Sequence, residues 1–304
     1  MGNAIIHDSS IAHLTERLGL GQPAHPLIAI IDTSVLAVPE EAVGNKLISD
    51  MYCIAMKDPN CGLDYGRNAY DFTSGSMLFT APGQAITLTR AHEANEIGGW
   101  LLYVHPDLIR NTALGSNIDS YSFFDYDVYE ALHLSEQEEQ TMNQCLEMIR
   151  HEINQRIDNH SREVLVANLE LMLKYASRFY ERQFNTRAAQ NTDVAATVER
   201  LLKAWYSEKD ALEGGQPSIH YLAEACNVSP SYLSDLLKKA TGRTAKDHIN
   251  DFIINKAKTL LLSSTDSISG VAYQLGFNYP HYFSRLFKTK TGMTPQAYRD
   301  TKAA

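Results

Sequence analysis

Several features that mark membrane-spanning, secreted or disulfide-bonded proteins are absent from this 304-residue sequence. It has no apolar run of the roughly 18 residues that a transmembrane helix needs. Its first residues, MGNAIIHDSS, lack the basic and apolar regions of a secretory signal. The four cysteines show no CxxC spacing and no nearby histidine pair; they are Cys53, Cys61, Cys145 and Cys226. We therefore expect free thiols in a cytoplasmic protein, with neither a disulfide framework nor a zinc site.

Recognisable catalytic motifs are also missing. No HxH pair occurs, and His92 and His105 stand alone, whereas metal-dependent jelly-roll enzymes need clustered histidine and carboxylate ligands. The sequence shows no Gly-rich phosphate loop and no local Ser/His/Asp or Cys/His arrangement. We expect no catalytic residue, no metal site and no cofactor, and hence a protein that is not an enzyme.

The net charge of −9 hides an uneven distribution along the chain. From Gln216 to the end, 11 Lys and Arg oppose 6 Asp and Glu, a net charge of +5. The rest of the chain carries 16 against 30, a net charge of −14. An acidic body with a basic C-terminal third is typical of a protein with a nucleic-acid-binding module. Chance clustering of surface charge is the alternative at this point.

The N-terminal half has a β pattern between about residues 27 and 104. Short runs of aliphatic, aromatic and β-branched residues alternate with turn signals such as Asp58-Pro59-Asn60. The expected strands are Leu27–Ile31, Met51–Met56, Tyr70–Phe72, Ser76–Thr80 and Trp100–Val104. Strands this short, at this spacing, favour an antiparallel barrel or jelly roll, whose interior is suited to a small molecule.

Two long amphipathic helices are predicted within about residues 135–184. Ser135 and Glu138 have the spacing of a capping box at the start of the first helix. The apolar face of this helix is Met142, Leu146, Ile149, Ile153 and Ile157. The pair can pack against the barrel, against a second subunit, or against both with different faces. A polar, aperiodic stretch at 186–193 is expected to be a linker.

The C-terminal third contains one pattern twice. The segments that begin at Ser218 and Ser267 align at an offset of 49, which becomes 50 after one inserted residue. The matched residues include Asn227 with Gly276, Pro230 with Pro280, Tyr232 with Tyr282, Lys238 with Lys288, and Thr241-Gly242 with Thr291-Gly292. Asn and Gly both suit the left-handed position that ends a helix, and Pro suits the first position of a new one. Each copy therefore predicts a helix–turn–helix, at 218–240 and 267–290, with a connecting helix at 246–262.

The second copy resembles the C-terminal signature of the AraC/XylS family of bacterial transcription regulators. The residues that carry the resemblance are Val271-Ala272, Gly276-Phe277, Tyr282-Phe283-Ser284-Arg285-Leu286-Phe287-Lys288, Gly292, Thr294-Pro295 and Tyr298-Arg299. The resemblance covers about 194–299 and implies a DNA-binding domain over 194–304. Residues 1–185 are similar only in outline to the cupin-like effector-binding and dimerisation domain of many members. The expected fold class is thus α+β: a cupin-like antiparallel β-barrel with a helical pair, followed by an all-α tandem helix–turn–helix domain.

The resemblance also implies a function and partners. It implies a sequence-specific transcription regulator that binds double-stranded promoter DNA and is controlled by a small-molecule effector in the N-terminal domain. A homodimer through helices 135–184 is expected, together with RNA polymerase as a partner if the protein is an activator; no membrane partner is expected. The sequence singles out no effector-binding residue.

Base-reading residues follow from the resemblance as an i, i+4 pair in each recognition helix. These are His281 and Arg285 in the second copy, and Ser231 and Asp235 in the first. Lys238 and Lys288 are one turn further along, where contacts to phosphate are expected. Asp235 departs from the basic residue that many members carry at this position. It can accept a hydrogen bond from cytosine N4 or pair with Lys239 four residues on, and we favour the pairing.

The alternative is an enzyme that uses an AraC-like module for DNA targeting. One form is a metal-dependent barrel, and the other is a repair methyltransferase with a reactive cysteine in a Pro-Cys-His-Arg setting. Cys226 falls within the first helix–turn–helix, and the other cysteines lack that setting. Both forms are therefore disfavoured.

Overall fold

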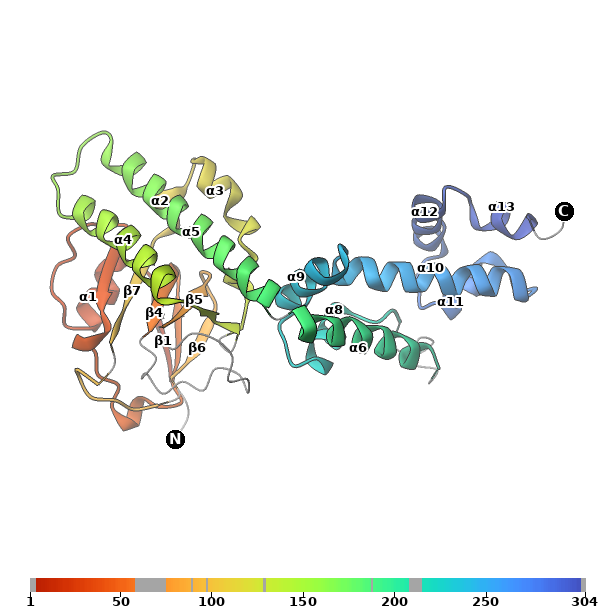
Figure 1. The fold of residues 1–304 in the computed structure, drawn as a ribbon, viewed down its shortest axis with the longest axis horizontal. Coiled ribbons are helices and arrows are strands. Elements are labelled where there is room, and N and C mark those ends of the chain that lie inside the picture. Colours follow the sequence, from red (N-terminus) through yellow and green to blue (C-terminus); the bar gives the residue numbers. More distant parts are fainter. Residues whose placement is uncertain are drawn as a thin grey trace. The chain divides into compact units, whose positions relative to one another are not determined.

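A computed structural model describes residues 4–57, 75–88, 90–96, 98–127, 130–186, 188–207 and 215–301 of the chain. The chain divides into two compact units, Met1–Gln183 and Phe184–Ala304 (Figure 1). The first combines sheets with helices and the second is helical, so the expected α+β class is confirmed. None of the helices in the described ranges is long and apolar enough to cross a membrane.

The larger sheet of the N-terminal unit is antiparallel, with the strand order β2-β7-β4-β5-β8. These strands are β2 (Ile28–Asp32), β4 (Tyr52–Lys57), β5 (Ser76–Thr80), β7 (Gly99–Val104) and β8 (Leu132–His133). Four of the predicted strands are confirmed to within one residue at each end. The predicted strand Tyr70–Phe72 and the turn at Asp58-Pro59-Asn60 lie outside the described residues.

A second sheet was not predicted in full. It contains β1 (Ile5–Asp8), β3 (Lys46–Ser49) and β6 (Ala85–Thr87). β1 lies before residue 27, where no strand was expected, and it pairs with β3 in parallel, so this pair departs from the expected antiparallel arrangement. Within the described ranges no strand pair joins the two sheets, so a closed barrel is not formed there and the cupin-like barrel stays a prediction. The short helices of this unit are α1 (Ile11–Arg17), α2 (Pro106–Ile109) and α3 (Ala113–Asn117).

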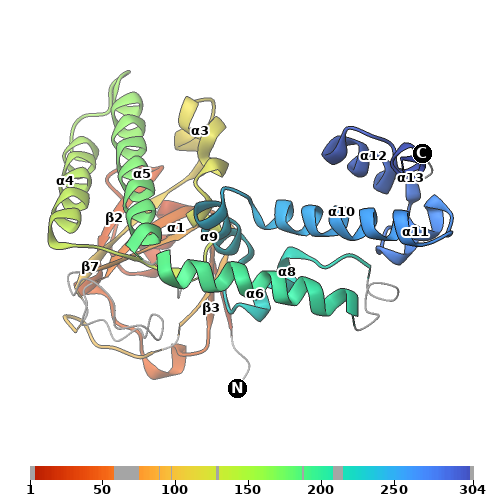
Figure 2. The ribbon, with the colours of Figure 1, turned by 45° about the vertical axis from the view of Figure 1, so that its right-hand side comes forward.

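The predicted helical pair is present as α4 (Glu136–Ile153) and α5 (Ser161–Thr186), which lie side by side (Figures 1 and 2). The capping box of Ser135 and Glu138 is confirmed, since each side chain accepts from the other residue's backbone N–H. Ile157 was wrongly placed on the apolar face: α4 ends four residues earlier, and Ile157 is 64% exposed. The amide Nδ2 of Asn154, just past the helix end, donates to the Arg150 carbonyl.

The helical pair covers the larger sheet. The Trp100 indole N–H of β7 donates to Asn143 Oδ1 of α4 at 2.8 Å. The Phe79 ring of β5 lies 6.1 Å, between centroids, from the Tyr180 ring of α5. Of the two packing modes that the sequence left open, the one against the sheet is thus observed.

Most of the residues in the stretch expected to be a linker, 186–193, are helical, and the linker role stays a prediction. α5 continues to Thr186, and α6 (Ala188–Ser207) begins two residues later. The stretch is polar but contains neither Gly nor Pro, and polarity without a helix breaker does not end a helix. The domain limits derived from the sequence stay a prediction.

In the described ranges the C-terminal unit is helical, and its helices share an apolar core. After α6 its helices are α8 (Ile219–Ala225), α9 (Pro230–Thr241), α10 (Ala245–Ser263), α11 (Ile268–Gln274), α12 (Pro280–Thr291) and α13 (Pro295–Asp300). α10 is the long connecting helix, with α8 and α9 near its first half and α11 and α13 near its second (Figure 2), while the end of α12 pairs with residues of its first half. Fully buried residues from six of these helices meet in the core; they include Val198, Leu222, Leu233, Ile253, Val271 and Phe283.

Candidate nucleic-acid interface

The two copies of the repeat build the same corner. Both corner residues have a positive φ, 53° at Asn227 and 81° at Gly276, as predicted. Pro230 and Pro280 are the first helical residues of α9 and α12, where the missing N–H would have no partner in the helix. Each copy is therefore a helix–turn–helix in which the second helix, α9 or α12, is the candidate recognition helix.

The corner before α12 is also in close contact with the loop before α8. A Cβ atom on Gly276 would lie 2.5 Å from the carbonyl carbon of Gly215 and 2.8 Å from the Gln216 nitrogen. The Gly215 carbonyl accepts from the Trp205 indole N–H at 3.1 Å, and the Leu275 carbonyl accepts from the Tyr206 hydroxyl at 3.3 Å. The last turn of α6 thus holds both sides of this contact in place.

α12 separates an apolar face from a cationic one. Phe283 and Phe287 are fully buried. The predicted base-reading residues His281 and Arg285 and the predicted phosphate contact Lys288 are all exposed. Among the residues that the structure describes, neither Arg285 nor Lys288 belongs to an ion pair, so both charges are available to a ligand.

α9 is arranged differently. Ser231 and Asp235, the predicted base-reading residues of the first copy, are half-buried, while Lys238 is exposed. The predicted pairing of Asp235 with Lys239 stays a prediction. These three residues of α9 align in sequence with His281, Arg285 and Lys288 of α12, but the exposed surfaces of the two helices are not equivalent.

The C-terminal unit resembles known proteins. Residues 222–301 match the family described as "Helix-turn-helix domain", and the residues that resemble the AraC/XylS signature fall in this range. The uncharacterized HTH-type transcriptional regulator YobQ of Bacillus subtilis is 36% identical over 84 residues, 28% of this chain and 35% of that protein. The HTH-type transcriptional activator RhaS of Escherichia coli is 30% identical over 139 residues, 46% of this chain and 45% of that protein. Residues 222–301 are an AraC-type helix–turn–helix domain.

The chain spans about a third to a half of the length of these curated relatives. Among solved structures, it is similar to a transcriptional regulator of Chromobacterium violaceum that is described as containing an AraC-type DNA-binding domain. The identity is 21%, the match covers 38% of this chain and 96% of that one, and the TM-score is 0.32.

A network of charges fixes the end of α12 in the AraC-type domain. The Lys290 ammonium lies 3.0 Å from Asp251 and 3.3 Å from Asp247, both on α10. Hydrogen bonding to Asp251, and then to Asp247, raises the pKa of Lys290 despite an opposing effect of burial. Asp247 also completes a capping box with Thr244 at the start of α10. Lys290 therefore joins the recognition helix to the connector, whereas Lys288 forms no ion pair with any residue in the described ranges.

Sequence reasoning missed an aromatic cluster at the start of α12. The ring of Tyr282 lies 4.3 Å from that of His281 and 6.0 Å from that of Tyr279, measured between centroids. The guanidinium carbon of Arg285 lies 5.5 Å from the centre of the Tyr282 ring. The spacing of Tyr282 and Arg285, three residues apart on one helix, was the signal that could have shown their contact.

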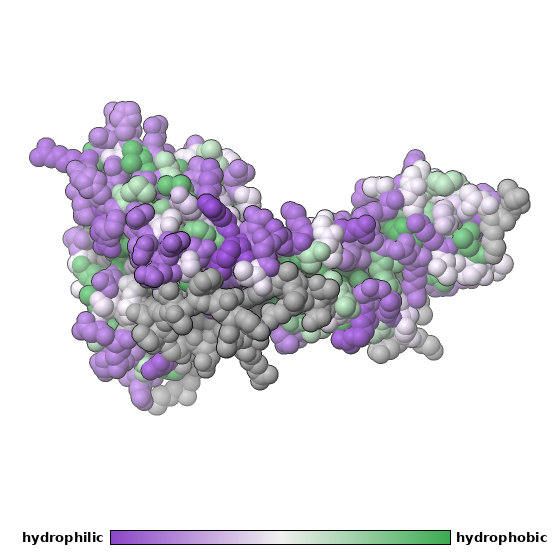
Figure 3. All heavy atoms as spheres, in the orientation of Figure 1, coloured by the Kyte–Doolittle hydropathy of each residue, from purple (hydrophilic) through white to green (hydrophobic). Residues whose placement is uncertain are grey.

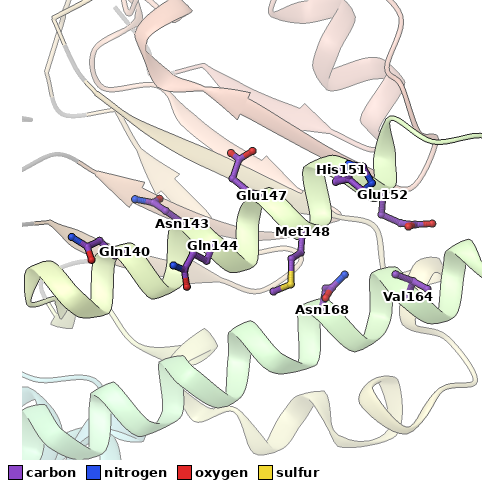
Figure 4. A pocket seen from close by; sticks show the side chains of 9 residues that line it. All are labelled: Gln140, Asn143, Gln144, Glu147, Met148, His151, Glu152, Val164 and Asn168. Carbon is purple, nitrogen blue, oxygen red and sulfur yellow. The ribbon is translucent and has the colours of Figure 1, made fainter.

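The N-terminal unit has one further candidate surface, a groove of about 930 Å³ between α4 and α5 (Figure 4). Figure 4 shows that α4 supplies most of its lining and that Met148 of α4 and Asn168 of α5 lie between the two helices. The lining residues are Gln140, Asn143, Gln144, Glu147, Met148, His151, Glu152, Val164 and Asn168. Across the described ranges no three His, Cys, Asp or Glu residues lie close enough to hold a metal ion.

Proposed function

We propose that the chain is a sequence-specific transcription regulator of bacterial type, which acts in the cytoplasm and binds double-stranded promoter DNA with α9 and α12. The observation that carries the proposal is the exposed, cationic face of α12 in an AraC-type domain that contains two helix–turn–helix units. The names of the matched relatives, regulators and activators of transcription, support it. RNA polymerase is a further partner if the protein is an activator.

Base reading in this proposal belongs mainly to α12. An arginine that donates two hydrogen bonds to guanine O6 and N7 discriminates by about 1–3 kcal/mol against another base. Arg285 is exposed and free of ion pairs within the described chain, so such a contact breaks no existing bond. His281 lies one turn before it and reads the neighbouring base, while Lys288 contacts phosphate.

The first helix–turn–helix contributes more by positioning the protein on DNA than by reading bases. Ser231 and Asp235 are half-buried, and a carboxylate near phosphates is electrostatically unfavourable. Lys238 is exposed and contacts phosphate. The connector α10 has 19 residues, a length of about 28 Å. This length can set α9 and α12 in successive major grooves, which are roughly 34 Å apart on one side of the duplex.

The test is a comparison of Arg285→Ala with Lys288→Ala. The probes are the duplex that the wild-type chain selects from a random-sequence library and a shuffled duplex of the same composition. We expect Arg285→Ala to weaken binding to the selected duplex by about 5- to 150-fold and to leave the shuffled duplex nearly unchanged. Lys288→Ala should weaken both equally and lower the slope of binding against salt by about one. Equal losses for Arg285→Ala on both probes, or selection of no preferred sequence, would refute the base-reading role.

The N-terminal unit is proposed as a cupin-like effector and dimerisation domain. Three large apolar side chains, Met148, Val164 and Leu171, are exposed on the helical pair. Figure 3 shows apolar residues among hydrophilic ones over this part of the surface. Exposed apolar groups on one helical face favour pairing with a second copy of the chain.

Control by a small effector is tested by thermal stability. A ligand that binds only the folded state raises the midpoint of unfolding. In a screen of sugars and other small metabolites against the full chain, we expect at least one compound to raise the midpoint and to change affinity for the selected duplex. A compound that raises the midpoint without changing DNA binding would count against a regulatory effector.

A further inference from the structure

Tyr282 matches Tyr232 in the repeat, but the two tyrosines have different surroundings. Tyr232 is only 6% exposed, and its ring packs 5.1 Å from that of Phe184. Tyr282 is 48% exposed, although Phe283 and Phe287 of the same helix fill the core completely. The ring of Tyr282 is therefore not needed to close the core, and a large aromatic group exposed on a recognition helix points to a role in binding.

The contacts of Tyr282 join both proposed base-reading side chains of α12. Its ring is 4.3 Å from the His281 ring and 5.5 Å from the Arg285 guanidinium carbon. A cation held over an aromatic face gains about 0.5–1 kcal/mol when exposed, and about 2 when water is excluded. DNA binding excludes water from this surface, so the contact between Tyr282 and Arg285 strengthens in the complex.

The start of α12, next to Tyr282, also lacks a side-chain helix cap. Ser229 caps α9 by accepting from the Tyr232 backbone N–H. The corresponding position before α12 is Tyr279, whose side chain makes no such bond and lies instead against Tyr282 and His281. A serine cap contributes about 1 kcal/mol to helix stability. Replacing it with an exposed aromatic ring makes sense if the ring belongs to the binding surface.

We propose that Tyr282 is a positioning residue for DNA reading: its ring face holds the Arg285 guanidinium and the His281 ring in the orientation that meets the base edges. Arginine has about 2 kcal/mol of side-chain conformational entropy, part of which is lost on binding. A guanidinium stacked on the Tyr282 ring has lost part of this conformational entropy already in the free protein, so less is lost on binding. Its N–H groups can still donate to guanine. The proposal rests on the proposed base-reading role of Arg285.

The experiment uses the full chain with the selected and shuffled duplexes defined above. Tyr282→Leu keeps apolar bulk and removes the ring, whereas Tyr282→Phe keeps the ring and removes the hydroxyl. Tyr273→Leu removes another exposed tyrosine, on α11, and is the control for loss of an exposed ring. All three should keep the wild-type midpoint of thermal unfolding, because none of these side chains is buried.

We expect Tyr282→Leu to weaken binding to the selected duplex about five- to thirteenfold, the gain of a cation–π contact that becomes desolvated on binding. Binding to the shuffled duplex should change less than about twofold, and Tyr282→Phe and Tyr273→Leu should behave as wild type. In an Arg285→Ala background, Tyr282→Leu should have little further effect, since the two residues act as a unit.

Several outcomes would overturn the proposal. Equal losses on both duplexes would make Tyr282 a phosphate or general contact, and a loss in Tyr282→Phe would assign the effect to the hydroxyl. An undiminished effect in the Arg285→Ala background would show that the ring does not act through Arg285. If Arg285→Ala weakens selected binding but Tyr282→Leu does not, this inference fails while the proposed function stands. If Arg285→Ala itself has no effect, the base-reading proposal fails first.

Discussion

Substitution of Gly276 by alanine tests whether close packing, as well as backbone conformation, requires glycine at the corner before α12. The residue has a φ of 81°, and a Cβ atom there would lie 2.5 Å from the carbonyl carbon and 2.6 Å from the oxygen of Gly215. Holding alanine in a left-handed conformation costs about 1–2 kcal/mol, and reduced freedom of the unfolded chain offsets about 0.4–1 of it. The clash is with backbone atoms, which cannot rotate away, and overpacking of this kind costs a further 1–3 kcal/mol or so. Gly276→Ala should therefore destabilise the domain by about 2–4 kcal/mol.

Gly292 and Gly242 provide matched controls. Each follows a recognition helix with a positive φ, 79° and 75°, and each has no atom within 4 Å of a built Cβ. Alanine at either position should lower the free energy of unfolding by only about 0–1.5 kcal/mol, the cost of the left-handed conformation less the offset from the unfolded chain. The measurement is urea unfolding of each full-length variant, followed by the helical signal at far-ultraviolet wavelengths. If Gly276→Ala is as mild as the two controls, the corner can move away from Gly215 and the packing argument is wrong.

Two further predictions concern the N-terminal unit. Burial raises the pKa of the Cys53 thiol to about 12, so native protein at pH 8 should hold Cys53 unalkylated until denaturant is added, as followed by peptide mass spectrometry. Alkylation at the rate of a free peptide thiol would contradict this. Met148 is exposed on the helical pair, so Met148→Glu should convert a dimer into monomer in sedimentation, whereas Met148→Leu should not. A dimer that withstands Met148→Glu would place the contact elsewhere.

The helix ends of the AraC-type domain could be predicted because their signals are local. Pro230 and Pro280 each begin a recognition helix, and Asn227 and Gly276 each take up the left-handed corner. These features depend on residues within a few positions along the chain, which a sequence shows directly. The capping box at Ser135 was predictable for the same reason.

The sheet pairing could not be predicted in the same way. β1 has only four residues, and its partner residues in β3 are 41 positions further along, as in the pair of Ile5 with Lys46. No periodicity within either strand indicates which distant strand it joins. The helical character of residues 188–193 could not be predicted for a different reason, because a polar stretch without apolar periodicity is typical of a linker as well as of a solvated helix.

The site itself could be predicted only in part, because exposure depends on partners outside the repeat. Tyr232 and Tyr282 match in sequence, yet the first is buried against Phe184, which precedes both copies. Assigning a role in one copy of the repeat from the matched residue of the other is therefore wrong wherever one copy has an additional neighbour. The cluster around Tyr282 became visible only from the ring distances.

A neighbour outside the repeat also explains the glycine at the second corner. Asn227 adopts a φ of 53° in the first copy, so a positive φ alone does not require glycine there. Gly276 differs because the Gly215 backbone occupies the space that a side chain would need. The Gly215 carbonyl is in turn held by the Trp205 indole N–H of α6. The corner that orients α12 is thus held by α6, and a rigid corner suits the helix on which we place most of the base reading.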